Sequence, residues 1–294
     1  MVTGASGLLG RAIVHALVGR DEVRATVRRP EAAEDLRALG AKVAIADGTE
    51  QDELIEILPR VHTLVHLVGG VNQPDDDEIL RANHRSVLAS VAAAKETGVR
   101  RLILVSVPGA DPDATHPFLR AKGLAEEAVV QSGLEHAVLR CGHAYGLGGL
   151  WFTATVVAGD AGFVVGDGHQ RLAPIAAEDV AGVVVAIDDR TDPVEGTWHL
   201  EGPDVVDADG LFSLLDDPDR VPEHLEPDEA AQRLTVLLER PVWPSTTRHL
   251  AAGTPPGSAA DASAEFGVHR TSLVDGLRRT AALAEAAVRV PGDA

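Results

Sequence analysis

A glycine pattern at the amino terminus limits the folds that this chain can adopt. Residues 3–10 read TGASGLLG, a G-x-x-G-x-x-G pattern between a short apolar stub and an amphipathic stretch. This strand–turn–helix setting is typical of a dinucleotide-binding loop, in which glycines permit the turn and let the backbone approach a pyrophosphate. The free N–H groups of the following helix also favour phosphate. The predicted phosphate-binding residues are Gly4, Ser6, Gly7, Leu8, Leu9 and Gly10.

Short apolar runs and amphipathic stretches alternate through the following residues. The predicted strands are Val23–Val27, Lys42–Ala46, His62–Val68, Arg101–Val107 and Glu135–Arg140. The predicted helices are Leu8–Val18, Pro30–Leu39, Gln51–Leu58, Glu78–Thr97 and Phe118–Gln131. This alternation implies right-handed βαβ units, so we expect an α/β Rossmann fold with a doubly wound parallel sheet. Only three residues precede Gly4, where a central strand of about five residues is expected, which favours a start codon upstream of Met1.

The alternation of predicted strands and helices becomes less regular in the second half of the chain. We expect a dinucleotide-binding core at residues 1–146 and a mostly substrate-binding region at residues 147–294, with residues 175–200 returning to the core. The elements predicted in this half are an amphipathic stretch at Ile175–Ile187, a strand at Thr197–Leu200 and a last helix at Val274–Val288. The composition of Ala252–Ala260 (AGTPPGSAA) predicts a flexible linker.

Charge and composition exclude several classes of protein. The chain has 26 lysine and arginine residues against 45 aspartate and glutamate residues, a net charge of −19. An acidic surface repels nucleic-acid backbones and anionic membranes, so we expect neither as a partner. A single cysteine, Cys141, allows no internal disulfide, and the sequence shows no metal-binding motif. Without an apolar run of about 20 residues or a secretory signal, we predict a cytoplasmic protein of undetermined oligomeric state.

The residues after two of the strands predict which dinucleotide binds. Arg28 and Arg29 follow Val27, at the position where NAD-binding proteins usually carry an acidic residue for the ribose hydroxyl. Guanidinium groups suit a 2′-phosphate instead, which favours NADPH over NADH. Asp47 and Gly48 follow the next strand at the cofactor crevice. Asp47 there either accepts a hydrogen bond from adenine or forms a strand-end turn.

Several further segments carry a resemblance to a known superfamily. They are VSVPGAD at 105–111, FLRAKGLAE at 118–126, SGL at 132–134, LR at 139–140, APIAAEDVA at 173–181 and FGV at 266–268. With these segments the chain resembles the atypical short-chain dehydrogenases/reductases, in the NmrA-like subgroup related to the nucleotide-binding accessory subunit of respiratory complex I. The resemblance covers most of the chain and implies a bound NADP(H).

The resemblance also implies a catalytic set of asparagine, serine, tyrosine and lysine. In this sequence the asparagine is Asn83, the serine is Ser106 and the lysine is Lys122, which in the superfamily also contacts the nicotinamide ribose. The tyrosine, which gives a proton to the ketone, should stand four residues before the lysine, where this chain has Phe118. The helical spacing still places Phe118 and Lys122 on one face, so the arrangement is retained while the acid is missing.

Other residues are predicted to lie near the nicotinamide or the substrate. Val68, Gly69, Cys141 and His143 are further predicted cofactor-binding residues. The resemblance implies that the segment with Cys141 and His143 passes the nicotinamide, and the Cys141 side chain itself is interpreted as small packing volume. The predicted substrate-lining residues are Phe118, Tyr145, Trp151, Phe152 and His116. Candidates for the missing acid are Ser106, His116, His143 and Tyr145, and a phenol of the substrate or a water molecule is a further candidate.

Two functions compete at this stage. The retained Asn83, Ser106 and Lys122 favour an NADPH-dependent ketoreductase acting on a polycyclic aromatic ketone of the polyketide or angucyclinone type. The missing tyrosine favours a catalytically silent NADP(H)-binding sensor or assembly protein. An epimerase or dehydratase of nucleotide sugars needs the same tyrosine and is the weaker hypothesis. We predict the reductase, with protonation assisted by the substrate or by water.

Overall fold

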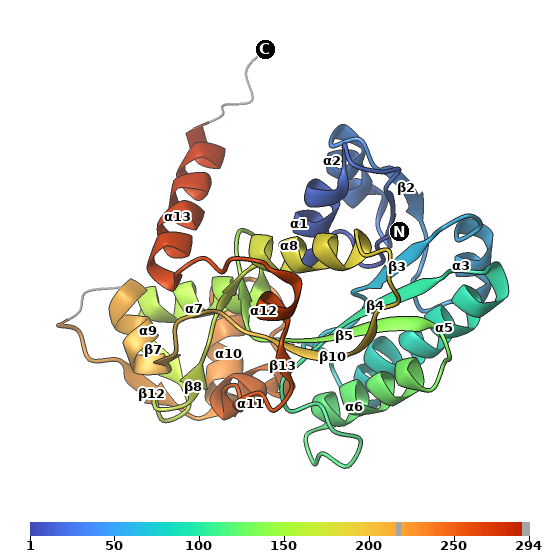
Figure 1. Ribbon diagram of the computed structural model, residues 1–294. Coiled ribbons are helices and arrows are strands. Elements are labelled where there is room, and N and C mark those ends of the chain that lie inside the picture. The colour runs from blue at the N-terminus through green and yellow to red at the C-terminus, as the bar shows by residue number, and fades with distance from the viewer. Residues whose placement is uncertain (216–218, 290–294) are drawn as a thin grey trace.

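Parallel strands form the centre of the computed structural model, which describes residues 1–215 and 219–289 (Figure 1). The strands of this sheet are β1 (Arg24–Val27), β2 (Lys42–Ile45), β3 (Thr63–His66), β4 (Arg101–Ser106), β5 (Glu135–Cys141), β10 (Glu195–Leu200) and β13 (Ala260–Asp261). Five of them follow the order β13–β10–β5–β4–β3, and β1 pairs with β2. All of these pairs are parallel, which confirms the predicted α/β fold.

The first residues of the chain join the two parts of the sheet. Val2 bridges Ala25 of β1 and Val65 of β3, both in parallel register. The Val2 N–H donates a hydrogen bond to the Arg24 carbonyl at 2.8 Å. The amino-terminal residues therefore occupy the predicted central position between β1 and β3, although they form a bridge and no full strand.

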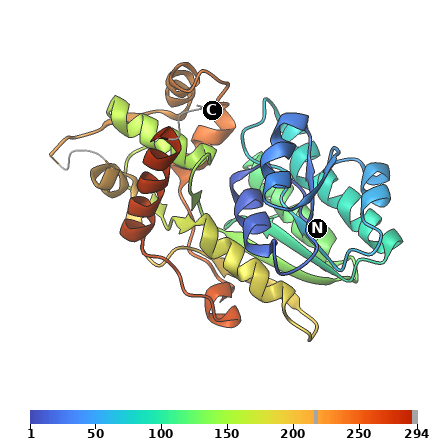
Figure 2. The same ribbon diagram turned by 90° about the horizontal axis from the view of Figure 1, so that it is seen from above.

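Helices cover both faces of the sheet. On one face α1 (Leu8–Leu17) packs against α8 (Ala177–Asp188), and on the other lie α3 (Gln51–Ile57), α5 (Ser86–Thr97) and α6 (Pro117–Val130) (Figures 1 and 2). Along β4, Ile103 belongs to the apolar cluster under α1 and α8, whereas Leu102 and Leu104 belong to the cluster under α3, α5 and α6. Side chains of a strand point alternately to the two faces of the sheet, so this alternation shows that β4 is buried on both faces.

The predicted helix Glu78–Thr97 is interrupted in the structure. It consists of α4 (Asp76–Leu80), a π-helical turn η2 (Arg81–Arg85) and α5. The Asn83 side chain donates to the Ile79 carbonyl at 2.9 Å, and Ser86 Oγ donates to the Ala82 carbonyl at 2.6 Å. Such a turn often marks a functional position, and here it contains Asn83. The predicted helix Pro30–Leu39 likewise begins as a 3-10 turn, η1 (Pro30–Ala32), before α2 (Ala33–Ala38).

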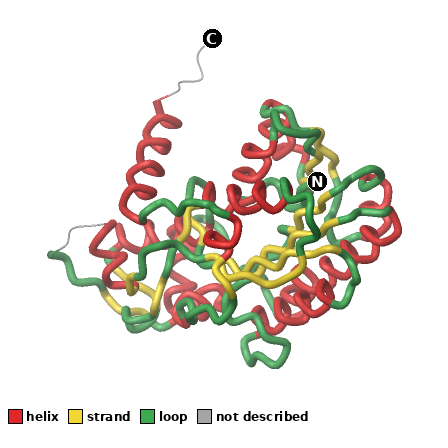
Figure 3. The backbone as a smooth tube through the Cα atoms, viewed as in Figure 1, coloured by secondary structure: helices red, strands yellow, loops and turns green. Residues whose placement is uncertain are grey.

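The remaining elements form a second, smaller layer beside the sheet (Figure 3). They are β6 (Ala144–Tyr145), α7 (Leu150–Ala161), β7 (Phe163–Val165), β8 (Arg171–Leu172), β9 (Ile175–Ala176), β11 (Val206–Asp207), α9 (Ala208–Leu215), β12 (Glu223–Leu225), α10 (Pro227–Leu237), α11 (Pro244–Ala252) and α13 (Leu273–Arg289), whereas α12 (Ala262–Phe266) packs on β10 and α8 of the sheet layer. Short strands pair as β6–β9, β7–β12 and β8–β11, and α13 projects away from the rest (Figure 1). Among the helices of the described ranges, none is long and apolar enough to cross a membrane.

The segment predicted as a flexible linker, Ala252–Ala260, is attached to the fold at two points. Gly253 and Thr254 are buried, and the Thr254 N–H donates to the Arg171 carbonyl at 2.7 Å. A Cβ atom on Gly257 would lie 2.1 Å from the ring of His199. Residues 255–258 are exposed, and the flexibility of the segment stays a prediction.

Candidate active site

A groove at the carboxyl ends of β1, β2 and β3 contains many of the predicted dinucleotide-binding residues. The predicted residues that line it are Gly4, Ser6, Gly7, Arg28, Gly48, Val68 and Gly69. The sequence analysis missed Thr49, Gln73 and Arg81, which also line it. Both predicted arginines are exposed, but Arg28 lines the groove, whereas Arg29 precedes η1 and is not part of the lining.

The glycine loop has the shape that a pyrophosphate requires. Helix α1 begins after Gly7, and no side chain caps its amino end, so its first N–H groups are free to bind phosphate. Gly4 has a φ of 65°, which favours glycine. A Cβ atom on Gly10 would lie 2.6 Å from Ala5 Cα, so this glycine lets the helix approach the loop. These residues fit a dinucleotide.

The two leucines of the motif support the loop from behind the groove. A Cβ atom on Gly149 would lie 2.7 Å from Leu8 Cδ2, and Leu9 packs against the main apolar cluster. Neither side chain lines the groove. Leu8 and Leu9 can therefore contribute to phosphate binding only through their backbone N–H groups at the start of the helix.

The adenosine end of the groove contains a second arginine besides Arg28. Arg81 forms an ion pair with Glu78 (Nη2 to Oε2, 2.8 Å) and donates to Thr49 Oγ1 at 3.4 Å. The hydrogen bonds that Arg81 donates to the Glu78 carboxylate chiefly raise the pKa of Arg81, so this cation remains charged. Asp47 Oδ1 accepts a hydrogen bond from the Thr49 N–H at 3.1 Å, which is the strand-end turn foreseen as one of its two roles.

The loop after β3 is held by the only two asparagines of the sequence. Asn83 accepts from the Gly70 N–H at 2.9 Å and donates to the Gly70 carbonyl at 3.0 Å. Asn72 Oδ1 accepts from the Trp243 N–H and from Thr246 Oγ1, both at 2.9 Å. Asn83 therefore shapes the loop, Asn72 ties it to α11, and the binding of a relay water by Asn83 stays a prediction.

Lys122 and Ser106 lie together at the carboxyl end of β4. Lys122 is buried, and its Nζ donates to the carbonyl of Val105, the neighbour of Ser106, at 3.2 Å. Burial lowers the pKa of Lys122 to about 8, with Glu126 acting in the opposite direction. Its Nζ is 5.9 Å from the centre of the Phe118 ring, as expected for residues on one helical face. Ser106 Oγ is buried and has no hydrogen-bond partner within the described ranges.

His249 lies among the rings of Phe118, His116 and His143. The ring centre of His249 is 5.1 Å from that of Phe118, 5.8 Å from that of His116 and 5.6 Å from that of His143. His116 also caps α6, where its Nδ1 accepts from the Phe118 N–H at 3.2 Å. Burial, followed by the neighbouring imidazoles, lowers the pKa of His249 to about 3. No motif marks His249 in the sequence, because α11 brings it here from a distant part of the chain.

His143 and Cys141 line a small cavity after β5. His143 Nδ1 lies 2.9 Å from Thr254 Oγ1, and the imidazole stacks on Trp151 with the ring centres 5.0 Å apart. Burial lowers the pKa of His143 to about 4 and raises the pKa of the Cys141 thiol to about 12. At neutral pH this part of the site is uncharged.

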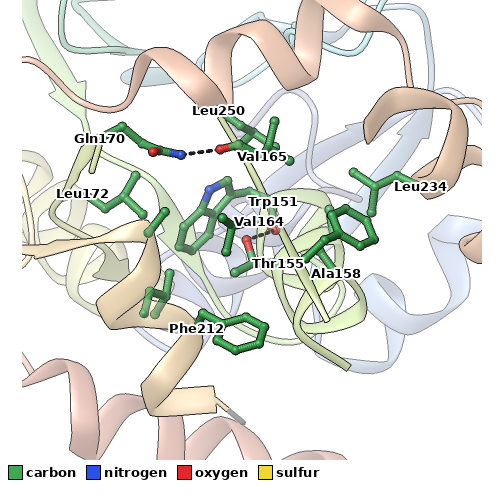
Figure 4. Close-up of a pocket in the computed structure, with 14 residues that line it drawn as sticks. Trp151, Thr155, Ala158, Val164, Val165, Gln170, Leu172, Phe212, Leu234 and Leu250 are labelled. Atoms are coloured by element: carbon green, nitrogen blue, oxygen red, sulfur yellow. Dashed lines mark hydrogen bonds between the residues drawn. The ribbon is translucent and has the colours of Figure 1, made fainter. Parts of the chain in front are cut away.

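Figure 4 shows a pocket with a mostly apolar lining. Its walls include Trp151, Thr155, Ala158, Phe163, Gln170, Leu172, Phe212, Leu234 and Leu250. Trp151, which stacks on His143, and Leu250, which follows His249, connect this pocket to the histidines. Gln170 Nε2 donates a hydrogen bond to the Val165 carbonyl, so the amino group of this side chain already has a protein partner. The lining suits an apolar group.

One predicted substrate residue, Tyr145, lies deeper than expected, and Phe152 beside it is half-buried. Tyr145 is 1% exposed, and a Cβ atom on Gly276 of α13 would collide with its hydroxyl. Its ring centre is 6.1 Å from that of Phe152. Burial, with Asp179 contributing, raises the pKa of Tyr145 to about 12. The structure therefore places Tyr145, with Phe152 beside it, in a core under α13 instead of at a substrate surface.

This fold and groove define a dinucleotide-binding protein, and comparison with known proteins agrees. The sequence profile of the NAD(P)H-binding family matches residues 4–190, so the chain belongs to this family. A ketoreductase of 4-hydroxy-2-methyl-3-oxo-4-farnesyl-3,4-dihydroquinoline-1-oxide from Stigmatella aurantiaca is 32% identical over 45% of this chain and 45% of that protein. The (4-alkanoyl-5-oxo-2,5-dihydrofuran-3-yl)methyl phosphate reductase of Streptomyces griseus is 28% identical over 71% of this chain and 69% of that protein.

A third relative belongs to the subgroup named by the resemblance. Subunit 9 of the NADH dehydrogenase [ubiquinone] 1 alpha subcomplex from Arabidopsis thaliana is 27% identical over 74% of this chain and 56% of that protein. Several such relatives are longer, and this chain spans about half their length. The comparisons confirm an NAD(P)-binding Rossmann protein related to the NmrA-like reductases.

Solved structures share the fold across nearly the whole chain. A triphenylmethane reductase of Citrobacter sp. complexed with NADP(H) superposes with a TM-score of 0.74 at 18% identity, covering 95% of this chain and 98% of that one. A UDP-glucose 4-epimerase of Thermotoga maritima gives a TM-score of 0.73 at 17% identity, covering 98% and 99%. At these identities the likeness shows the fold alone.

Proposed function

We propose that this protein is an NADPH-dependent ketoreductase that reduces a ketone on a polycyclic aromatic compound of the polyketide or angucyclinone type. The observation that carries the proposal is the buried Lys122 beside the unpartnered hydroxyl of Ser106. Burying an ammonium group opposes folding, so its retention indicates a ligand that uses it, and the buried Ser106 hydroxyl beside it adds a hydrogen-bond donor for a substrate carbonyl. A relative that is named as a ketoreductase supports the same chemistry.

Each end of the site has its own task in this reaction. The cofactor, when bound, supplies a hydride for the carbonyl carbon. The glycine loop would bind its pyrophosphate, and Arg28 its 2′-phosphate, which is the basis for NADPH over NADH. Lys122 would hold the nicotinamide ribose, and Ser106 Oγ would donate a hydrogen bond to the carbonyl oxygen of the substrate.

The proton has to come from a group other than the residue in the tyrosine position, because Phe118 has none to give. A phenol next to the ketone forms an internal hydrogen bond that polarises the carbonyl and receives the alkoxide charge, and water is the second source. The protein then needs chiefly to orient its reactants, which lowers a barrier by several kcal/mol. The apolar pocket with Trp151 and Leu250 suits the rings of such a substrate.

The test is NADPH oxidation by the purified protein with polycyclic aromatic ketones, in pairs with a free or a methylated neighbouring hydroxyl. We expect turnover of the hydroxylated members and a loss of turnover, with retained NADPH binding, in Ser106→Ala. Tight NADPH binding without oxidation of any ketone would instead support a silent NADP(H)-binding sensor or assembly protein.

A further inference from the structure

Two unpartnered polar atoms lie at the ends of neighbouring strands. Within the described part of the chain, Ser106 Oγ and His143 Nε2 are buried and form no hydrogen bond. Ser106 pairs with Arg140 across β4 and β5, and His143 follows β5 after two residues. Val107 and Pro108, which follow Ser106, form one small cavity together with His143. Leaving a buried polar atom unpaired costs about 1–3 kcal/mol. Two such atoms at neighbouring strand ends, with His143 and the residue after Ser106 lining one cavity, point to a ligand that completes their hydrogen bonds.

We propose that His143 is a catalytic residue whose Nε2–H donates, with the hydroxyl of Ser106, a hydrogen bond to the carbonyl oxygen of the substrate. This inference rests on the proposed function, ketone reduction. The carbonyl carbon gains a hydride from the reduced cofactor, and the π electron pair of the C=O bond moves to oxygen. The alkoxide then takes its proton from the phenol of the substrate or from water, and His143 keeps its own proton throughout.

Thr254 is the positioning residue for this imidazole. Its Oγ1 lies 2.9 Å from His143 Nδ1, and when the hydroxyl donates to Nδ1 the ring proton is on Nε2. The backbone of Thr254 is itself held, because its N–H donates to the Arg171 carbonyl at 2.7 Å. Stacking on Trp151, with 28° between the planes, restrains the rotation of the ring.

The groups around His143 keep its imidazole neutral. Burial lowers its pKa to about 4, although the Glu201 carboxylate acts in the opposite direction. The nearest imidazole, His249, is neutral at pH 7 as well, and the buried thiol of Cys141 stays protonated. A neutral imidazole gives up its N–H proton too reluctantly to act as an acid, yet it donates a good hydrogen bond. This arrangement therefore stabilises the alkoxide without replacing the acid that Phe118 lacks.

The tautomer of His143 provides a test that needs no turnover. Nitrogen-15 shifts of the histidine rings, assigned by the loss of signals in His143→Gln, report which nitrogen carries the proton. We expect the neutral Nε2–H form between pH 5 and pH 8 in the wild type and in Thr254→Ser, and a mixture of tautomers in Thr254→Val. A dominant Nδ1–H form in the wild type would overturn the inference.

Steady-state kinetics with a ketone that is turned over provides the second test. His143→Phe keeps a flat ring on Trp151 but has no donor, so we expect kcat to fall roughly 10²–10³-fold, with KM and the Kd of NADPH changed less than about twofold. His143→Gln, whose amide N–H reaches the Nε2 position, should recover at least about a tenth of the lost rate. Normal turnover by His143→Phe refutes this inference alone, whereas no turnover by the wild type refutes the proposed function.

Discussion

Replacing Lys122 by methionine is expected to make the protein more stable while abolishing its turnover. The lysine is 7% exposed, and its Nζ forms a hydrogen bond to the Val105 carbonyl. Burial lowers its pKa from 10.5 to about 8, so the folded protein holds this proton less tightly than the unfolded chain does. Methionine fills a similar volume without a charge.

The pKa shift of Lys122 sets the size of the effect. Because each tenfold change in proton affinity is worth about 1.4 kcal/mol, the shift opposes folding by roughly 3 kcal/mol at pH 7. The hydrogen bond that methionine loses offsets about 1 kcal/mol of this. We therefore expect Lys122→Met to raise the free energy of unfolding by about 2 kcal/mol at pH 7. The penalty is fully present below pH 8 and fades as the pH rises from 8 towards 10.5, where the lysine is neutral in both states.

Urea unfolding followed by circular dichroism at pH 7 and pH 10 measures this difference. The advantage of the variant should fall to near zero at pH 10, because the wild type no longer buries a charge there. Lys95→Met, at an exposed position of α5, is the matched control and should stay within about 0.5 kcal/mol of the wild type at both values. A variant less stable than the wild type at pH 7, or a difference that does not change with pH, would refute the reasoning.

Three further predictions follow from other parts of the site. Arg28→Ala should weaken NADPH binding roughly tenfold and NADH binding little, with Arg29→Ala as the control; equal losses of both dinucleotides in titrations would contradict the assignment of the 2′-phosphate. Phe118→Tyr should raise kcat less than about tenfold, since Phe118 packs in an apolar cluster with Ile79 and Ala121, whose side chains cannot hydrogen-bond a new hydroxyl; a gain of several hundredfold would show that the site still depends on the tyrosine acid. Arg171→Met should lower the free energy of unfolding by about 1–2 kcal/mol at pH 7, measured by urea unfolding, because the buried Glu201 carboxylate loses the two hydrogen bonds that Arg171 donates to it. The pKa of Glu201 is lowered to about 2, so this loss should shrink as the pH falls from 4.5 towards 2, and a loss independent of pH would argue against it.

Local patterns allowed much of the cofactor groove to be predicted. The glycine loop, the strand ends at Arg28 and Gly48 and the end of β3 each depend on residues adjacent in sequence, and they do line one groove. Arg81 was missed because it reaches the groove from the π-helical turn, which a helical periodicity does not reveal. Tyr145 was expected near the substrate, but α13 covers it from the far end of the chain.

The sequence by itself determined the α/β class, the position of the dinucleotide groove and the loss of the tyrosine acid. These depend on short-range spacing: alternating apolar runs, a glycine triplet, and a lysine one helical turn after Phe118. Only the tertiary structure brought His249 and Thr254 to His143, tied Asn72 to α11 and, among the described residues, left Ser106 Oγ and His143 Nε2 buried without a hydrogen-bond partner. These contacts join residues more than 100 positions apart, and their pairing depends on how the second half packs on the sheet.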